Sequence, residues 1–118
     1  MRNDDLVRDL LELVANADGT VNAYELDGYS RKEVLFHVQI LAEAGLIIAN
    51  IQNAMGAPGV VCEIERMTFA GTDYYAAIQS PRVWSAVKNK LIDHSVGLSL
   101  DAIAEVARKV ALSQMGLL

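Results

Sequence analysis

The sequence predicts an α+β fold in which a capped helix leads directly into a two-stranded hairpin and further helices follow. Three observations carry this prediction. They are a helix-start signature at Ser30, two apolar runs separated by a loop rich in Gly and Pro, and amphipathic segments with helical spacing at both ends of the chain. The 118 residues fit one domain of ordinary size, long enough to bury its own core.

The first helix is expected over residues 4–17, where leucine and valine recur at helical spacing. Asn3 is a suitable N-cap, because its side-chain oxygen can accept from the unpaired N–H groups of the first turn. Gly19 ends this helix, and residues 20–26 are expected to form a short extended stretch that begins with β-branched side chains.

A second helix is predicted from Arg31 to Ala44. Ser30 and Glu33 have the spacing of a capping box, in which each side chain accepts from the other residue's main-chain N–H. Gly45 then ends the helix. The inward face is expected at helical spacing, on Val34, Val38, Leu41 and Ala42.

Two strands are predicted next, Leu46–Gln52 and Val60–Thr68, joined by the loop Asn53–Gly59. The second strand alternates, with Val60, Cys62 and Ile64 on one face and Val61, Glu63 and Glu65 on the other. This pattern predicts an antiparallel hairpin.

Three helices are expected in the rest of the chain. They are Ala70–Ile78, a helix that starts at Ser80-Pro81 and ends near His94, and a last helix capped by Ser99 that runs from Leu100 to about Met115. We therefore divide the sequence into a core, residues 1–70, and C-terminal helices, residues 71–118, that pack on the core or form a dimer interface.

This order is the layout of a winged helix-turn-helix with a two-stranded wing hairpin and a C-terminal helical extension. Residues 30–44 would be the recognition helix and residues 53–59 the wing. In place of the usual second helix the chain offers only residues 21–28, which read as strand or turn.

Tyr29–Ile47, with its Ser start and its Glu-Ala-Gly-Leu-Ile end, resembles the recognition-helix stretch of winged-helix regulators. Over nearly its whole length the chain also resembles a phage and bacterial family of short winged-helix proteins classed as a domain of unknown function. The matching landmarks include Met67–Asp73, Val83-Trp84 and Leu98–Asp101. The resemblance implies an architecture and a phage or prophage association.

Charge is distributed unevenly along the chain. Residues 1–70 hold five basic and eleven acidic side chains, a net charge of −6, whereas residues 71–118 hold five basic and four acidic ones, a net charge of +1. The single Cys62 favours a reducing compartment, and neither a signal core nor an apolar run of roughly 18 residues is seen. We expect a soluble cytoplasmic protein that does not span a membrane.

DNA binding is one functional hypothesis. Arg31 and Lys32 at the start of the recognition helix, together with His37 and Gln39, are its candidate contacts. Against it, residues 50–60 of the wing region hold no Lys or Arg, and DNA readers usually present a basic face.

Protein binding is the preferred hypothesis. Leu35, Phe36 and Ile40 lie outside the inward stripe of the second helix, and the uncharged wing tip carries Met55, so these four residues are the candidate protein contacts. The alternative is that all of these side chains belong to the core.

Self-association is a third hypothesis, because the last helix carries more apolar surface than one small core usually takes. A homodimer through this helix would use Val106, Leu112, Met115 and Leu117. The alternative is that the helix packs on the other helices of its own chain.

Catalytic patterns are missing from the sequence. Two distant histidines and one cysteine give no zinc motif, no phosphate-binding loop is present, and Cys62 on a strand is expected to be an inert buried thiol. We therefore expect no enzyme, metal or cofactor. The first choice of function is a protein-binding module of phage or prophage origin that modulates a host or phage protein. The second is a DNA-binding transcriptional regulator.

Overall fold

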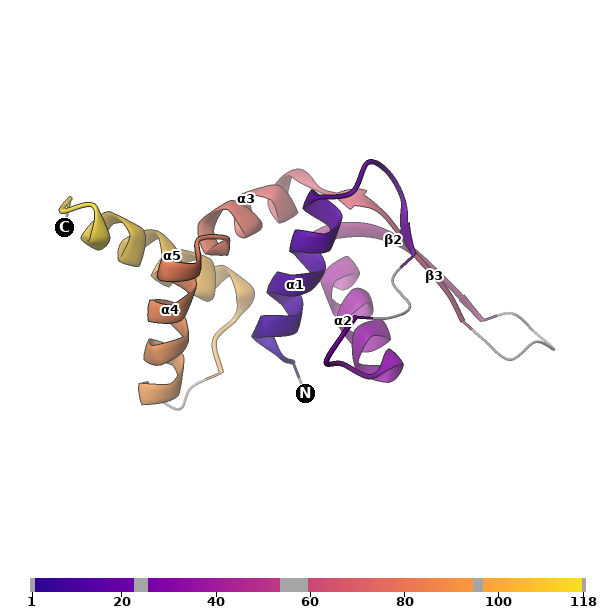
Figure 1. Cartoon of the computed structure of the whole chain (residues 1–118), viewed down its shortest axis with the longest axis horizontal. Helices are drawn as coiled ribbons and strands as arrows, with labels where there is room; N and C mark the ends of the chain where they lie inside the picture. Colours follow the sequence, from indigo (N-terminus) through magenta and orange to yellow (C-terminus); the bar gives the residue numbers. More distant parts are fainter. Residues whose placement is uncertain (1, 23–25, 54–59, 95–96, 118) are drawn as a thin grey trace. The chain divides into compact units, whose positions relative to one another are not determined.

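The computed structural model describes residues 2–22, 26–53, 60–94 and 97–117 (Figure 1). The chain divides into two compact units, Met1–Thr72 and Asp73–Leu118, called unit 1 and unit 2 below. Helices combine with one three-stranded antiparallel sheet, so the α+β class expected from the sequence is confirmed.

Unit 1 contains α1 (Asp4–Ala15), β1 (Val21–Asn22), α2 (Arg31–Glu43), β2 (Ile47–Asn53) and β3 (Val60–Met67). The central strand of the sheet is β3, which pairs antiparallel with both β1 and β2. Figure 1 shows β2 and β3 running side by side away from the two helices. The predicted hairpin is therefore present, and the predicted extended stretch 20–26 is reduced to a two-residue β1 among its described residues.

Capping residues fix both helix starts as expected. The Asn3 side chain accepts from the N–H groups of Asp5 and Leu6, and Ser30 and Glu33 form the capping box. The helix expected over residues 4–17 ends earlier, at Ala15, where Asn16 is the C-cap.

The end of α2 is a Schellman motif. Gly45 has φ +76°, the Gly45 N–H donates to the Ala42 carbonyl at 3.0 Å, and the Leu46 N–H donates to the Leu41 carbonyl at 3.0 Å. Both leucines are buried, at 0% and 7% exposure, so the apolar contact that accompanies this motif lies in the core.

The core of unit 1 lies between the inner faces of α1, α2 and the sheet. The inward residues of α2 were predicted well, although Ala42 is only half-buried. On β3, Cys62 and Ile64 are buried as predicted, Glu65 is exposed and Glu63 is half-buried, whereas the side chains of Val60 and Val61 lie outside the described part. The core side chains are Leu6, Val7, Leu10, Leu11, Val14, Val21, Val34, Val38, Leu41, Leu46, Ile47, Cys62 and Ile64.

Helix α3 (Phe69–Ile78) starts against the end of α2. The Thr68 hydroxyl donates to the Gly45 carbonyl and accepts from the Gly71 N–H, and the Thr68 N–H donates to the Leu46 carbonyl. Gly71 lies so close to this turn that an added Cβ would come within 1.9 Å of the Leu46 carbonyl oxygen. Only glycine fits there.

Unit 2 begins within α3 and continues with α4 (Pro81–His94) and α5 (Leu100–Gln114). Ser99 caps α5, as expected, and the Ser80 hydroxyl accepts from the Val83 N–H at the start of α4. On α4, Val83, Trp84 and Val87 are buried and Leu91 is half-buried. The core side chains are Tyr74, Ile78, Val83, Trp84, Val87, Ile103, Ala104, Ala107 and Val110.

Candidate interaction surface

Helix α2 carries most of the predicted contact residues, and the structure separates them. Arg31, Lys32 and Gln39 are exposed, whereas His37 is 1% exposed. Leu35 and Ile40 are half-buried, so they contribute to the core as well as to the surface. The outer face of α2 is accordingly narrower than the sequence suggested.

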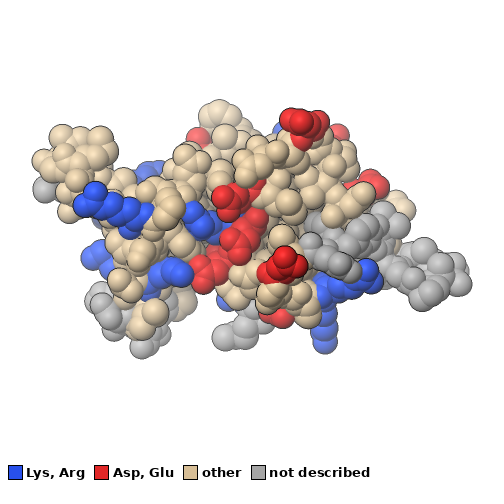
Figure 2. All heavy atoms as spheres, in the orientation of Figure 1, with Lys and Arg blue, Asp and Glu red and all other residues tan. Residues whose placement is uncertain are grey.

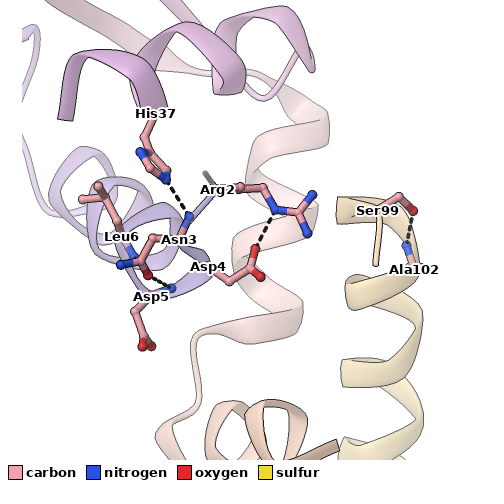
Figure 3. A network of polar contacts seen from close by, with 8 residues as sticks. All are labelled: Arg2, Asn3, Asp4, Asp5, Leu6, His37, Ser99 and Ala102. Atoms are coloured by element: carbon pink, nitrogen blue, oxygen red, sulfur yellow. Dashed lines mark hydrogen bonds and ion pairs between the residues drawn. The ribbon is translucent and has the colours of Figure 1, made fainter. Parts of the chain in front are cut away.

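His37 joins α2 to the start of α1 (Figure 3). Its Nε2 lies 2.7 Å from the Asn3 main-chain nitrogen, and its Nδ1 lies 2.7 Å from the Glu33 carbonyl oxygen. Because the Asn3 N–H can only donate, Nε2 accepts, and Nδ1 carries the proton that is donated to Glu33. The prediction that His37 contacts DNA is wrong, because burial and these two hydrogen bonds occupy the whole ring.

A second polar contact fixes the approach to α2. The Tyr29 hydroxyl donates to the Asp9 carboxylate on α1 at 3.1 Å. Burial of the phenol, together with the hydrogen bond and the negative charge of Asp9, raises the pKa of Tyr29 to about 12. Long-range contacts such as those of His37 and Tyr29 leave no spacing signal in a sequence.

The start of α1 also holds a carboxylate with a shifted pKa. Burial raises the pKa of Asp4, and the Arg2 guanidinium, 2.9 Å away and drawn in Figure 3, opposes that shift. Both side chains are half-buried and form a local ion pair at the start of α1.

The exposed face of α2 has an aromatic side chain at its middle. Phe36 is 41% exposed, and its ring meets the His37 ring edge-on, with centroids 5.4 Å apart. The stripe Lys32, Phe36, Gln39 and Glu43 follows helical spacing, and all four side chains are exposed. Phe36 was predicted as a protein contact, and it is accessible for that role.

Two further apolar side chains of unit 1 are exposed and were missed from the sequence. Phe69, the first residue of α3, is 83% exposed, and Ile48 lies beside a register shift in the β2–β3 pairing. The extra residue of that shift, Glu65, lies on β3, so β2 keeps its alternation and Ile48 lies on the exposed face of the strand, next to the buried Ile47. The predicted contact Met55 lies outside the described residues.

The charges on the outer face of α2 cancel. Arg31 and Lys32 near its start are balanced by Glu33 and Glu43, and all four are exposed. Figure 2 shows most of the visible carboxylates over unit 1, with one group of Lys and Arg side chains at the lower right of that unit, and further Lys and Arg side chains over unit 2. A continuous cationic surface for phosphates is not seen among the described residues of α2.

The predicted dimer residues of α5 separate into two groups. Leu112, Met115 and Leu117 are exposed, whereas Val106 is half-buried. Leu112 lines a groove beside α3, and Val106 lines a different groove beside α4 with Lys90 and Lys109. A single flat interface therefore does not contain all four.

Potential metal ligands and reactive side chains are the other candidates for a site among the described residues. Within residues 2–22, 26–53, 60–94 and 97–117 no group of three or more potential metal ligands is found. Cys62 is buried, as expected, and burial raises the pKa of its thiol, which keeps it protonated and unreactive. No helix in the described part of the chain is long and apolar enough to cross a membrane.

Comparisons with known proteins identify relatives of the chain. A Haemophilus influenzae protein described as "Uncharacterized protein" is 31% identical over 117 residues, which cover 97% of each chain. No solved structure matches. The model of the family described as "Hypothetical protein (DUF2513)" matches residues 1–97, from α1 through the end of α4, and the chain belongs to this family.

Proposed function

We propose that the protein is a non-enzymatic binding module, and that unit 1 holds a protein partner on the outer face of α2. The observation that carries the proposal is Phe36, a large apolar side chain 41% exposed at the middle of a helix whose surface charges cancel. Aromatic anchors surrounded by polar side chains are typical of protein interfaces.

A winged-helix type of unit 1 is part of this proposal. It is supported by the order α1, β1, α2, β2, β3, by the sheet order β1-β3-β2, and by a capped α2 that leads directly into the hairpin. The departure is the segment before α2. There Gly28 has φ +91° and the Tyr29 N–H donates to the Leu26 carbonyl, so a turn stands where a further helix would lie.

The electrostatics favour a protein over DNA as the partner. The part of the chain up to residue 70 has a net charge of −6, and cations facing phosphates supply most non-specific DNA affinity. An acidic module with one apolar anchor suits a partner with cationic side chains around an apolar pocket. We place that partner among host or phage proteins and the complex in the cytoplasm, with no cofactor.

DNA binding is the second candidate. It is favoured by the exposed side chains of Arg31 and Lys32 at the N-terminal end of α2. The side chain of Gln39, seven residues after Lys32 on the same helix, is exposed as well. In helix-turn-helix proteins the same end of the recognition helix meets the base edges.

Two variants separate these functions. In the native host, the tagged protein should retain a partner that Phe36→Asp releases, with an affinity loss of about thirtyfold for an anchor residue. Phe69→Ala is the matched control, because Phe69 is the more exposed phenylalanine of unit 1 and should leave retention unchanged. Retention of the same partner by Phe36→Asp would refute the proposal.

The second variant tests the DNA alternative. The native protein should pass through a DNA column at low salt. Salt-sensitive retention that is lost in Arg31→Glu/Lys32→Glu, and kept in Phe36→Asp, would establish the regulator instead.

A further inference from the structure

We propose that a second copy of the chain docks on unit 2, in the groove between α3 and α5, to form a two-fold dimer. This groove is lined mainly by Asp73, Ala76, Ala77, Arg108, Ala111 and Leu112, all of them in unit 2. The inference is independent of the partner that α2 binds.

The end of α5 repeats the end of α2, with one difference. Gly116 has φ +76°, the Gly116 N–H donates to the Ser113 carbonyl at 3.0 Å, and the Leu117 N–H donates to the Leu112 carbonyl at 2.9 Å. These are the two bonds of a Schellman motif, which brings Leu117 next to Leu112.

Exposure distinguishes the two motifs. The leucine pair at the end of α2 is buried, whereas Leu112 is 39% and Leu117 is 64% exposed. Met115, one helical turn after Leu112, is exposed as well. The end of α5 therefore presents three exposed apolar side chains, of which Leu112 also lines the groove.

The groove has the shape for a helix end. Its volume is about 670 Å³, and the small side chains Ala76, Ala77 and Ala111 are part of its lining. Small side chains let another helix approach closely, because interaxial distance depends on the side chains at the contact. In a two-fold arrangement the Leu112–Leu117 end of each copy enters the groove of the other.

The charges that line the groove favour a second copy of the chain as its occupant. Asp73 on α3 and Arg108 on α5 line the same groove, and neither is in a salt bridge within the described part of the chain. In the isologous contact that we propose, Asp73 of each copy faces Arg108 of the other, so the dimer contains two equivalent ion pairs. The groove beside α4 carries Lys90 and Lys109 and would place like charges together in the same arrangement.

The test is the mass of the protein in solution, measured by sedimentation equilibrium over a concentration series. The native chain, 12.8 kDa, should approach twice that mass. Asp73→Arg and Arg108→Asp should each weaken the dimer about tenfold or more, because each replaces two attractive contacts by two repulsive ones.

Mixing the two variants gives the decisive result. A D73R chain and an R108D chain, each weak alone, should form a one-to-one heterodimer with affinity near that of the native protein, since both ion pairs are then restored, one in the native sense and one with its charges exchanged. Lys109→Glu, on the other groove, is the matched control and should leave the dimer unchanged.

Two outcomes would overturn the proposal. One is a native chain that stays monomeric at the highest concentration reached. The other is a native dimer that both charge reversals leave intact while circular dichroism reports folded protein. A dimer that Lys109→Glu dissociates would instead place the interface on the groove beside α4.

Discussion

Gly71 packs against the turn between α2 and β2, where there is no room for a side chain. A substitution at Gly71 therefore gives the clearest prediction of a loss of stability. In Gly71→Ala the new Cβ would lie 1.9 Å from the Leu46 carbonyl oxygen and 2.9 Å from its carbonyl carbon. Both atoms are main chain, and they are held by the hydrogen bonds of Thr68 and by the Schellman motif. The neighbour therefore cannot move aside without breaking the start of α3.

The magnitude follows from two opposing terms. Overpacking costs about 3 kcal/mol at the upper end of its usual range. The better helix propensity of alanine returns about 1 kcal/mol. The expected net loss is about 2 kcal/mol or more, which lowers the Tm by about 8–12 °C for a chain of this length.

Gly19→Ala is the control, because nothing lies within 4 Å of a Cβ added there and Gly19 has an ordinary φ. Its Tm should stay unchanged or rise slightly. The assay is thermal and urea unfolding followed by circular dichroism. Equal Tm values for Gly71→Ala and Gly19→Ala would refute the close approach of α3 to the α2–β2 turn.

Three further predictions concern the contacts that hold α2. His37→Phe keeps the ring volume but leaves the Asn3 N–H without its acceptor, so the free energy of unfolding should fall by about 1–3 kcal/mol; an unchanged urea midpoint would contradict this. Ser30→Ala removes the capping box and should cost about 1 kcal/mol, whereas Ser113→Ala should change little. Tyr29 should ionise near pH 12. The measurement is an ultraviolet titration of the native protein from which the titration of Tyr29→Phe is subtracted, and Asp9→Asn should lower the pKa of Tyr29. Since the folded pKa is the raised one, the stability that Tyr29 contributes is full below pH 10 and lost as pH rises through about 12; a difference titration centred near pH 10 would contradict the Asp9 contact.

Local signals predicted most of the elements. Asn3, Ser30 and Ser99 were recognised as caps because capping depends on residues two or three positions apart. The hairpin was recognised from the alternation along β3 and the Gly/Pro-rich loop before it. Element ends moved by one or two residues, as at Ala15, because fraying and caps decide them.

The contacts between elements were not predictable in the same way. The spacing of His37 places it on the inward face of α2 with Val34, Val38 and Leu41, but its hydrogen bond to Asn3, 34 positions away, has no signal in the sequence. The close approach of Gly71 to Leu46 likewise depends on how α3 leaves β3. For the candidate surface, the sequence identified Phe36 but not Phe69, because Phe69 lies where β3 gives way to α3 and neither periodicity assigns it to a face.

With both proposals the protein would have two separate binding faces. The outer face of α2 in unit 1 would hold the partner, and the groove of unit 2 would hold a second copy. A dimer would then present two copies of the α2 face, and a bivalent partner would bind it more tightly than either face alone.

The most direct measurement places a photo-crosslinking amino acid at position 36 in the native host and analyses what becomes attached. The account predicts a protein adduct that forms from position 36 and is absent when the same group is placed at position 69. Attachment to DNA alone, or equal protein adducts from both positions, would contradict the claim that the outer face of α2 binds a protein.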